Sequence, residues 1–192
     1  MPDPPRHPII HLNGFPGVGK LTIARHLTSR LSANLIHNHL LVNPADAVLH
    51  RTQPGYQTLR RAIRAAVLDA LADEPATYGT SYVFTDFQSS DELGASVCAE
   101  YIAAAVGRDA PFIPVVLLCD EDVNMQRLVS PERETYSKLM DVELVARFRR
   151  EKEVCRLGKH PNFFELDVSG LEPGEAARRI YDHVVRVCPE VK

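Results

Sequence analysis

The chain has 192 residues, 45% of them hydrophobic and 24% charged, which is typical of one globular domain of about 100–200 residues and excludes a second large domain. The 22 Lys and Arg against 25 Asp and Glu give a net charge of −3, with no basic run that would indicate binding to nucleic acid or to an anionic membrane. Because it lacks an apolar run of ~18 residues and a signal peptide, we expect a cytoplasmic protein with a disordered tail at residues 1–8.

Short apolar runs alternate along the chain with longer segments of helical periodicity. The runs predict five strands, at residues 9–12, 35–36, 82–85, 113–119 and 163–168. The periodic segments predict helices at 20–32, 56–72, 91–106, 120–128, 141–156 and 174–187. Alternating strands and helices imply parallel pairing, and near-continuous apolar strands suit a sheet that is covered on both faces. We therefore predict one α/β domain over residues 9–192, a three-layer α/β/α sandwich.

The strongest chemical signal is the sequence Gly-Phe-Pro-Gly-Val-Gly-Lys at residues 14–20, between a predicted strand and a predicted helix. Glycines let backbone N–H groups surround phosphate oxygens, and the positive end of the helix attracts the same anion. Lys20 in the first helical turn opposes the helix dipole by about 0.3–1 kcal/mol, a penalty that a bound anion reverses. We predict a nucleotide-phosphate loop with Lys20 on the outer phosphates. The residues of this predicted site are Gly14, Phe15, Pro16, Gly17, Val18, Gly19, Lys20, Leu21 and Thr22.

The predicted metal site departs from the common pattern, in which a Ser or Thr directly after the lysine ligates Mg²⁺. Position 21 is Leu, and the hydroxyl arrives one residue later at Thr22. The loop resembles that of the nucleoside monophosphate kinases, Gly-x-Pro-Gly-x-Gly-Lys-Gly-Thr, with Leu21 in place of their last glycine. The resemblance implies that phosphates and water hold Mg²⁺, without a direct protein ligand, and that Thr22 contacts the inner phosphate.

The resemblance extends over nearly the whole chain to small P-loop kinases, including adenylate, shikimate, gluconate and chloramphenicol kinases, and to related AAA-type ATPase-like proteins. It implies a P-loop NTPase fold, a five-stranded parallel sheet in the order 2-3-1-4-5, and ATP with Mg²⁺ as cofactors. Residues 129–137, which interrupt a helical pattern at Ser130-Pro131, correspond to a small mobile lid. Residues 166–173 resemble the loop beside the nucleotide base, although Ser169 and Glu172 at capping-box spacing equally predict a capped helix start.

Two groups are candidates for the base that activates an acceptor hydroxyl. Asp86 ends the third predicted strand, where open α/β sheets bind ligands, and is predicted to accept this proton or to hold a water of the Mg²⁺ shell. A turn aspartate that caps backbone groups is the structural alternative. His39 titrates near neutrality and is the other candidate base. The sequence does not choose between them.

The predicted substrate-binding residues are His37, Asn38, Arg60 and Arg64. The first two follow the second predicted strand, where related kinases place acceptor-binding or base residues, and a period of two puts His37 and His39 on one face. Arg60, Arg61 and Arg64 fall in one helical turn. Forked hydrogen bonds from this turn suit an anionic acceptor, and a solvated helix face is the alternative.

Arg127 and Arg133 bracket the predicted lid. Phosphoryl transfer spreads charge over the equatorial oxygens, so catalysis depends mainly on positioning and on cations. We predict that these two arginines lie over the phosphates when the lid closes. Exposed helix charges are the structural alternative.

The combined signals predict an ATP-dependent phosphotransferase that moves the γ-phosphoryl group of Mg-ATP to a small hydroxyl-bearing or anionic metabolite. Its predicted catalytic residues are Lys20, Asp86, His39, Arg127 and Arg133. An ATP- or GTP-hydrolysing switch and a non-catalytic nucleotide-binding protein are the alternatives. The Asp-Gly-Phe-Pro-Arg stretch of the monophosphate kinases is missing after the third strand, which counts against a nucleotide as acceptor.

Overall fold

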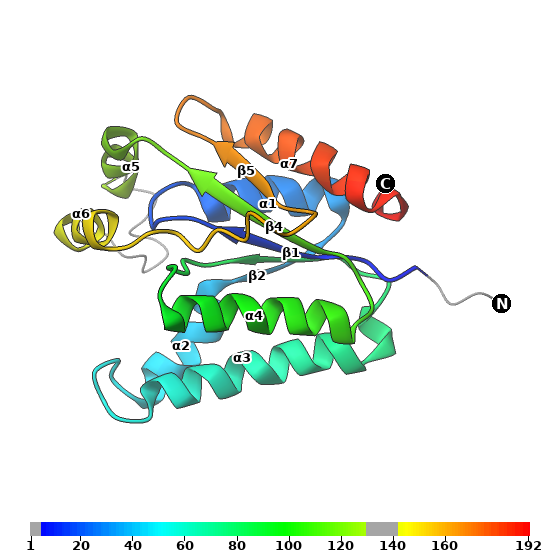
Figure 1. Cartoon of the computed structure of the whole chain (residues 1–192), viewed down its shortest axis with the longest axis horizontal. Helices are drawn as coiled ribbons and strands as arrows, with labels where there is room; N and C mark the ends of the chain where they lie inside the picture. Colours follow the sequence, from blue (N-terminus) through cyan, green and yellow to red (C-terminus); the bar gives the residue numbers. More distant parts are fainter. Residues whose placement is uncertain (1–4, 130–141) are drawn as a thin grey trace.

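The structure, a computed structural model, describes residues 5–129 and 142–192. At its centre lies a parallel five-stranded sheet in the order β2-β3-β1-β4-β5, which confirms the predicted fold and strand order (Figure 1). The strands are β1 (Ile9–Asn13), β2 (Asn34–His37), β3 (Tyr82–Thr85), β4 (Phe112–Leu118) and β5 (Phe164–Asp167).

Helices cover both faces of this sheet (Figure 1). One face carries α1 (Lys20–Leu31) and α7 (Pro173–Val187), and the other carries α3 (Tyr56–Asp73) and α4 (Glu92–Gly107), with α2 (Asn38–Val48) packed on α3. The helices α5 (Glu121–Leu128) and α6 (Val142–Glu151) lie beyond the carboxyl ends of the strands. Short 3₁₀ turns at Pro75–Thr77 and Pro189–Val191 follow α3 and α7. The architecture is the predicted three-layer sandwich.

The central strand β1 is buried along its whole length. Successive side chains of a strand point to opposite faces, so Ile10 and Leu12 join the core under α1 and α7, whereas Ile9 joins the core under α3 and α4. His11 points to the second of these layers, where its ring stacks on Tyr101 of α4 with a centroid distance of 4.5 Å. A polar side chain is thereby placed within this layer.

The helix α2 was not predicted from the sequence. Its buried side chains Leu41, Val42 and Ala45 have helical spacing, but Pro44 inside the helix removes a backbone donor and disguises the pattern. Because helical backbone begins at Asn38, directly after the strand, the expectation that His37 and His39 share a strand face was wrong.

The chain after α6 also differs from the prediction. The predicted helix 141–156 ends at Glu151. Beyond it, Val154 forms an isolated antiparallel bridge with Ser89, and the Cys155 N–H donates to the Gln88 carbonyl at 2.9 Å. These bonds attach the segment to the loop between β3 and α4. The predicted lid lies outside the described residues, except for Val129 at the end of α5, and so does Arg133.

The described part of the predicted N-terminal tail is attached to the body of the protein. Arg6 donates to the Arg108 carbonyl at 2.7 Å, and the His7 N–H donates to the Tyr78 carbonyl at 2.9 Å. Arg108 is completely buried, and its guanidinium donates to backbone carbonyls, including that of His7 at 3.1 Å. These bonds tie Arg6 to the end of α4 and His7 to the segment before β3.

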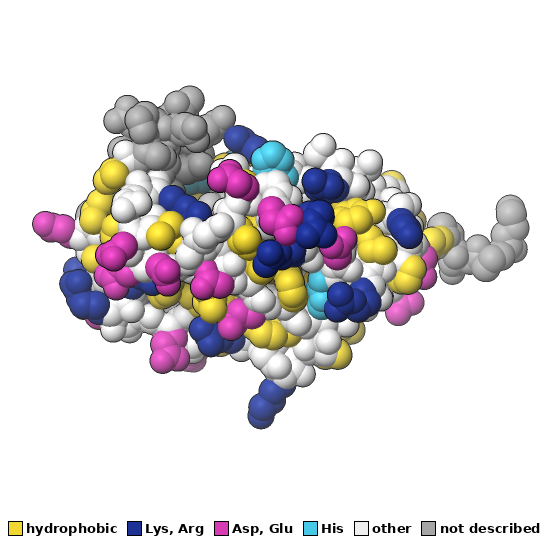
Figure 2. Space-filling view, turned by 90° about the horizontal axis from the view of Figure 1, so that it is seen from above, with side chains coloured by type: hydrophobic (Ala, Val, Ile, Leu, Met, Phe, Trp, Pro, Cys, Tyr) yellow, Lys and Arg dark blue, Asp and Glu magenta, His cyan; other side chains and the backbone are white. Residues whose placement is uncertain are grey.

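Charges on the molecular surface are mixed. Basic and acidic side chains are interspersed on the face seen in Figure 2. On the exposed side of α7, Arg178 pairs with Glu175 at 2.8 Å and with Asp182 at 2.9 Å. Among the described helices, none combines the length and the hydropathy needed to cross a membrane.

Candidate functional site

The predicted phosphate loop connects β1 to α1 at the carboxyl end of the sheet. Gly17 and Gly19 have φ angles of +94° and +97°, a backbone region that favours glycine. Gly19 is the N-cap of α1 and, as a glycine, has no side chain to cap the first N–H groups of the helix. The first N–H groups of a helix have no intrahelical partner, so those of α1 suit an anion in the loop.

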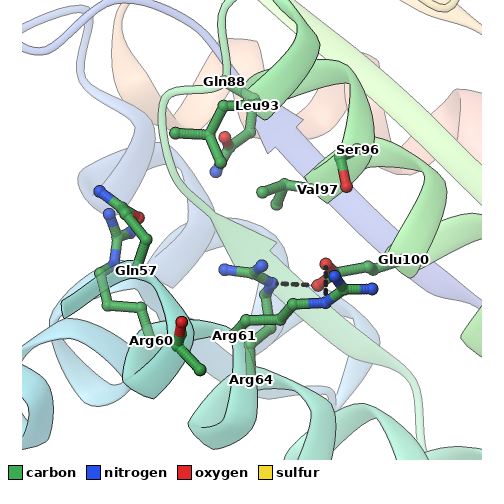
Figure 3. Close-up of a pocket in the computed structure, with 10 residues that line it drawn as sticks. Gln57, Arg60, Arg61, Arg64, Gln88, Leu93, Ser96, Val97 and Glu100 are labelled. Atoms are coloured by element: carbon green, nitrogen blue, oxygen red, sulfur yellow. Dashed lines mark hydrogen bonds and ion pairs between the residues drawn. The ribbon is translucent and has the colours of Figure 1, made fainter. Parts of the chain in front are cut away.

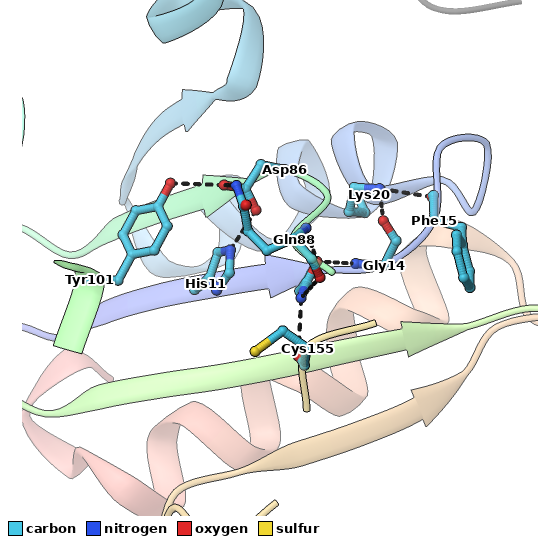
Figure 4. Close-up of polar contacts among 9 residues, drawn as sticks. His11, Gly14, Phe15, Lys20, Asp86, Gln88, Tyr101 and Cys155 are labelled. Atoms are coloured by element: carbon cyan, nitrogen blue, oxygen red, sulfur yellow. Dashed lines mark hydrogen bonds and ion pairs between the residues drawn. The ribbon is translucent and has the colours of Figure 1, made fainter. Parts of the chain in front are cut away.

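Lys20 lies across the mouth of this loop (Figure 4). Its Nζ donates to the Gly14 carbonyl at 2.5 Å and to the Phe15 carbonyl at 2.8 Å. The ammonium charge therefore lies near the positive end of α1, and the two reinforce each other's attraction for an anion. Leu21 is half-buried in the first turn of the helix, and Thr22 beside it is exposed.

The space around the loop leaves no room for a side chain on Gly17. A Cβ there would collide with Asn124 Nδ2 and approach Leu128 Cγ to 2.8 Å. Asn124 is fully buried and its Nδ2 donates to the Pro16 carbonyl at 2.9 Å. The outer side of the loop therefore packs tightly against α5.

We expect Gly17→Ala to weaken nucleotide binding about tenfold or more, because a methyl group at positive φ costs roughly 1–2 kcal/mol before the collision with Asn124 is added. Titration with Mg-ATP measures the effect. Gly158→Ala is the matched control, since a Cβ at Gly158 meets nothing within 4 Å. Equal affinities of the two variants would contradict the fit of a nucleotide to this loop.

Arg127, predicted to lie over the phosphates, binds backbone carbonyls in this structure. Its guanidinium donates to Val18 at 3.3 Å, to Val168 at 2.9 Å and to Ser169 at 3.2 Å. It thereby joins the phosphate loop to the loop that follows β5. This places Arg127 beside the predicted nucleotide site, in a role that orders two loops.

The capping-box interpretation of Ser169 and Glu172 is wrong. The helix α7 begins at Pro173, and its N-cap Glu172 forms no side-chain cap bond. Ser169 Oγ instead accepts from the Asp120 N–H at 2.8 Å and donates to Asp167 Oδ1 at 2.6 Å. Hydrogen bonds from the Ser169 hydroxyl and N–H lower the pKa of Asp167. The loop after β5 is thus built around Ser169.

Asp86 lies at the end of β3, as predicted, but its carboxylate faces the layer under α4 (Figure 4). Oδ1 is 2.6 Å from His11 Nε2, and Oδ2 accepts from Gln88 Nε2 at 2.7 Å and from the Tyr101 hydroxyl at 3.0 Å. Asp86 is only 6% exposed. Both oxygens therefore have protein partners, an arrangement that differs from that of a turn aspartate capping backbone groups.

Two opposing effects act on this buried carboxylate. Burial raises the pKa of Asp86, but the charge of His11 and hydrogen bonds from His11, Gln88 and Tyr101 outweigh it and hold the pKa below its ordinary value. For Tyr101, burial and the neighbouring Asp86 both raise the pKa well above its ordinary range. The group is an ionised carboxylate that accepts from a neutral phenol.

Asn13 at the end of β1 connects the phosphate loop to the loop after β3. Its Oδ1 accepts from the Gly14 N–H at 2.8 Å and from the Gln88 N–H at 2.9 Å. Its Nδ2 donates to the Gln88 carbonyl at 3.0 Å and to the Cys155 carbonyl at 3.1 Å. Asn13 and His11 were missed as site residues, and the signal for them was two polar residues within a buried strand.

A pocket of about 240 Å³ lies between α3 and α4 (Figure 3). It brings together Arg60 and Arg64, as predicted for an acceptor site, whereas His37, Asn38 and His39 are not among its described lining residues. Gln88 reaches the pocket from the loop after β3, so the pocket and the Asp86 cluster share a residue. The lining residues are Gln57, Thr58, Arg60, Arg61, Arg64, Gln88, Leu93, Ser96, Val97 and Glu100.

The arginines of this pocket differ in their partners. Arg64 is buried and pairs with Glu100 at 2.6 Å, and the more exposed Arg61 is 3.4 Å from the same carboxylate (Figure 3). Arg60 lies over the Tyr56 ring, 5.9 Å from its centroid. Three arginines against one glutamate leave the pocket basic, with Arg60 and Arg61 closer to solvent than Arg64.

The predicted alternative base, His39, lies in the first turn of α2. Its Nδ1 is 3.2 Å from Asn43 Oδ1, and its ring centroid is 6.1 Å from that of His37. The described residues hold no group of three or more His, Cys, Asp or Glu with the geometry to hold a metal ion.

No protein-family model matches the sequence, and no curated protein matches it. Solved structures match over nearly the whole chain. Gluconokinase from Sinorhizobium meliloti 1021 has a TM-score of 0.62 at 14% identity, over 98% of this chain and 97% of that one. Shikimate kinase from Acinetobacter baumannii, in complex with shikimate, has 0.57 at 16% identity, over 95% of each chain. APS kinase from Mycobacterium tuberculosis, in complex with AMPPNP and APS, has 0.54 at 18% identity, over 94% and 99%. The chain has the fold of the P-loop small-molecule kinases.

Proposed function

We propose that the protein is a P-loop kinase that transfers the γ-phosphoryl group of Mg-ATP to a small hydroxyl-bearing or anionic metabolite. The observation that carries this proposal is the shared residue Gln88, which lines a basic pocket and is held by Asn13 next to the phosphate loop. The proposed donor and acceptor sites would thereby meet near the carboxyl end of the sheet, where open α/β sheets bind ligands. Because a fold alone does not define an activity, the site supplies the argument.

The nucleotide is proposed to bind at residues 14–22. Backbone N–H groups at the start of α1 and the Lys20 ammonium would hold its phosphates, and Thr22 would contact the inner phosphate. Mg²⁺ would neutralise charge on the transferring group while held by phosphates and water. Arg127 would keep the two loops around the nucleotide in place, and Arg133 stays a predicted contact of the phosphates.

The acceptor is proposed to bind in the pocket between α3 and α4. Its volume of about 240 Å³ lies below the ~300–1,000 Å³ of most ligand sites, which favours a small molecule. Arg60 and Arg61 would bind an anionic group, whereas Arg64 is already paired with Glu100. His37 and Asn38 stay predicted contacts at the end of β2.

Asp86 is the better placed of the two candidate bases, because the pocket residue Gln88 donates to it directly. Its depressed pKa keeps it ionised at neutral pH, as accepting a hydroxyl proton requires. It would reach an acceptor only by exchanging one of its present partners. To hold a water of the Mg²⁺ shell, Asp86 would also have to exchange one of its present partners.

The test is ADP release from Mg-ATP by the purified protein with a panel of acceptors: sugars, sugar acids, shikimate-like acids, nucleoside monophosphates and phenicol antibiotics. We expect release that depends on one class of small acceptor and that disappears in Lys20→Ala. Release that no acceptor changes would support the hydrolytic switch. Binding of Mg-ATP without any release would support the non-catalytic alternative, and no binding would contradict the proposal.

A further inference from the structure

Arg149 is a residue of α6 whose guanidinium lies against the outside of the phosphate loop. Nη1 donates to Asn124 Oδ1 at 3.1 Å, and Nη2 donates to the Cys119 carbonyl, just after β4, at 3.0 Å. The same guanidinium lies over the Phe15 ring, 5.1 Å from its centroid, a cation–π contact. Arg149 thus contacts α5, the end of β4 and the loop at the same time.

Asn124 connects Arg149 to the backbone of the loop. A side-chain amide has one acceptor oxygen and one NH₂ donor. Because Oδ1 accepts from Arg149, the NH₂ group is directed to the Pro16 carbonyl, at 2.9 Å. A rotated amide would place its oxygen against that carbonyl and its NH₂ against the guanidinium. The bond from Arg149 therefore favours the same orientation of the buried amide as the bond to Pro16 does.

The outer part of the loop depends on this support. Its internal backbone bond, from the Val18 N–H to the Phe15 carbonyl, is long at 3.4 Å. Pro16 has no N–H to donate. The contacts from Asn124 and Arg149 therefore add to the Lys20 bond on the Phe15 carbonyl in supporting residues 15–17, where the backbone–backbone hydrogen bonding is weak.

A second contact links the same helix to the loop. The ring of Phe148, next to Arg149 in α6, lies 5.9 Å from that of Phe87, which lies 5.1 Å from the Phe15 ring. The helix α6 therefore contacts Phe15 directly through Arg149 and indirectly through Phe148 and Phe87. Arg147, on the same helix, offers a contrast, because its side chain is 56% exposed and 3.9 Å from Glu151.

We infer that Arg149 is a positioning residue for the phosphate loop: acting through Asn124 and Phe15, it holds residues 15–17 in the shape that receives the nucleotide's phosphates. The inference rests on the proposed function, since it requires a nucleotide at this loop. It requires no contact between Arg149 and the nucleotide.

The first test compares Arg149→Gln with the matched control Arg147→Gln by titration with Mg-ATP. We expect about tenfold weaker binding for Arg149→Gln, because a charge-assisted bond is lost, and a change within about twofold for Arg147→Gln. Arg149→Lys keeps a cation over Phe15 but lacks the forked donors, so its affinity for Mg-ATP should lie between those of the native chain and Arg149→Gln. In turnover assays the KM for Mg-ATP should rise while the KM for the acceptor stays the same.

The second test asks whether Arg149 acts through Asn124. Asn124→Leu keeps a similar volume without adding charge and removes both the acceptor for Arg149 and the donor to Pro16, so it should weaken Mg-ATP binding about as much. Because the two residues form one path, the double variant Arg149→Gln/Asn124→Leu should bind Mg-ATP no more weakly than the weaker-binding single variant.

The outcomes separate the two proposals. A native chain that does not bind Mg-ATP would contradict the proposed function and this role with it. Binding that Arg149→Gln weakens no more than Arg147→Gln does would overturn the positioning role alone. Losses that multiply in the double variant would show that Arg149 and Asn124 act separately, which also overturns it. If Arg149→Gln does not fold, the same comparison is made with Arg149→Lys and Asn124→Leu.

Discussion

Lys20→Ala is expected to lower kcat/KM for phosphoryl transfer by at least about 10²–10³-fold, the usual effect of removing one preorganised cation or donor from a charged transition state. The Lys20 ammonium lies at the mouth of the loop, on the Gly14 and Phe15 carbonyls. In P-loop chemistry catalysis consists largely of positioning and charge stabilisation, so little else can replace this cation. Steady-state kinetics with the acceptor found in the panel measures the loss.

The same substitution should leave the fold intact. The helix α1 is anchored by the buried residues Ile23, Ala24, Leu27 and Leu31, and alanine has a higher helix propensity than lysine. Removing a cation from the first turn also relieves its repulsion by the helix dipole. Lys159→Ala, at an exposed turn, is the control for the loss of a lysine. Activity close to that of this control would be incompatible with the assigned role of Lys20.

The second large effect is expected on stability: Asp86→Asn should reduce the free energy of unfolding by about 3–5 kcal/mol, because each buried hydrogen-bond donor left without its acceptor costs about 1–3 kcal/mol. The asparagine would present an NH₂ group to neighbours that are themselves donors, His11, Gln88 and Tyr101. At about 2–4 °C per kcal/mol for a chain of this size, the Tm should fall by about 6–20 °C.

The deficit of this variant should depend on pH in a defined direction. The pKa of Asp86 is depressed in the folded protein, so its ionised form stabilises the fold above the ordinary pKa of about 3.9. This contribution is lost as pH falls through the folded-state pKa. The difference between native chain and variant should therefore be full near pH 7 and should shrink in acid, as followed by urea unfolding at each pH.

Asp69→Asn provides the matched control, since Asp69 is exposed on α3. It should change the stability by less than about 0.5 kcal/mol. If Asp86→Asn is no more destabilising than this control, the Asp86 carboxylate does not stabilise the contact between the sheet and α4.

The strands were the most predictable part of the fold. A strand covered on both faces is mostly apolar, so β1, β3 and β4 are visible as apolar runs with few polar residues. The end of α6 and the whole of α2 were less visible. Pro44 breaks the sequence pattern of α2 but not the helix itself, because the buried face of Leu41, Val42 and Ala45 compensates for one missing hydrogen bond.

The phosphate loop was predictable for a different reason. Its residues are contiguous, and its conformation depends on glycines at positive φ and on a helix that starts directly after them. All the residues of such a site lie in one short stretch of sequence. The arginine turn of α3 was visible in the same way, although sequence periodicity alone did not show that Arg64 is neutralised by Glu100, 36 residues away.

By itself, the sequence determined the layers and the loop that would hold phosphates, since these follow from local pattern, whereas the strand order came from the resemblance to P-loop kinases. Only the tertiary structure decided what each polar side chain faces. It turned Asp86 toward His11, 75 residues away, and set Arg127 on backbone carbonyls. It also placed Arg149 on Asn124, 25 residues away. The physical reason is that a buried polar group pairs with the partners that the packing of distant elements brings within hydrogen-bond distance. The spacing of residues along the chain does not predict these partners.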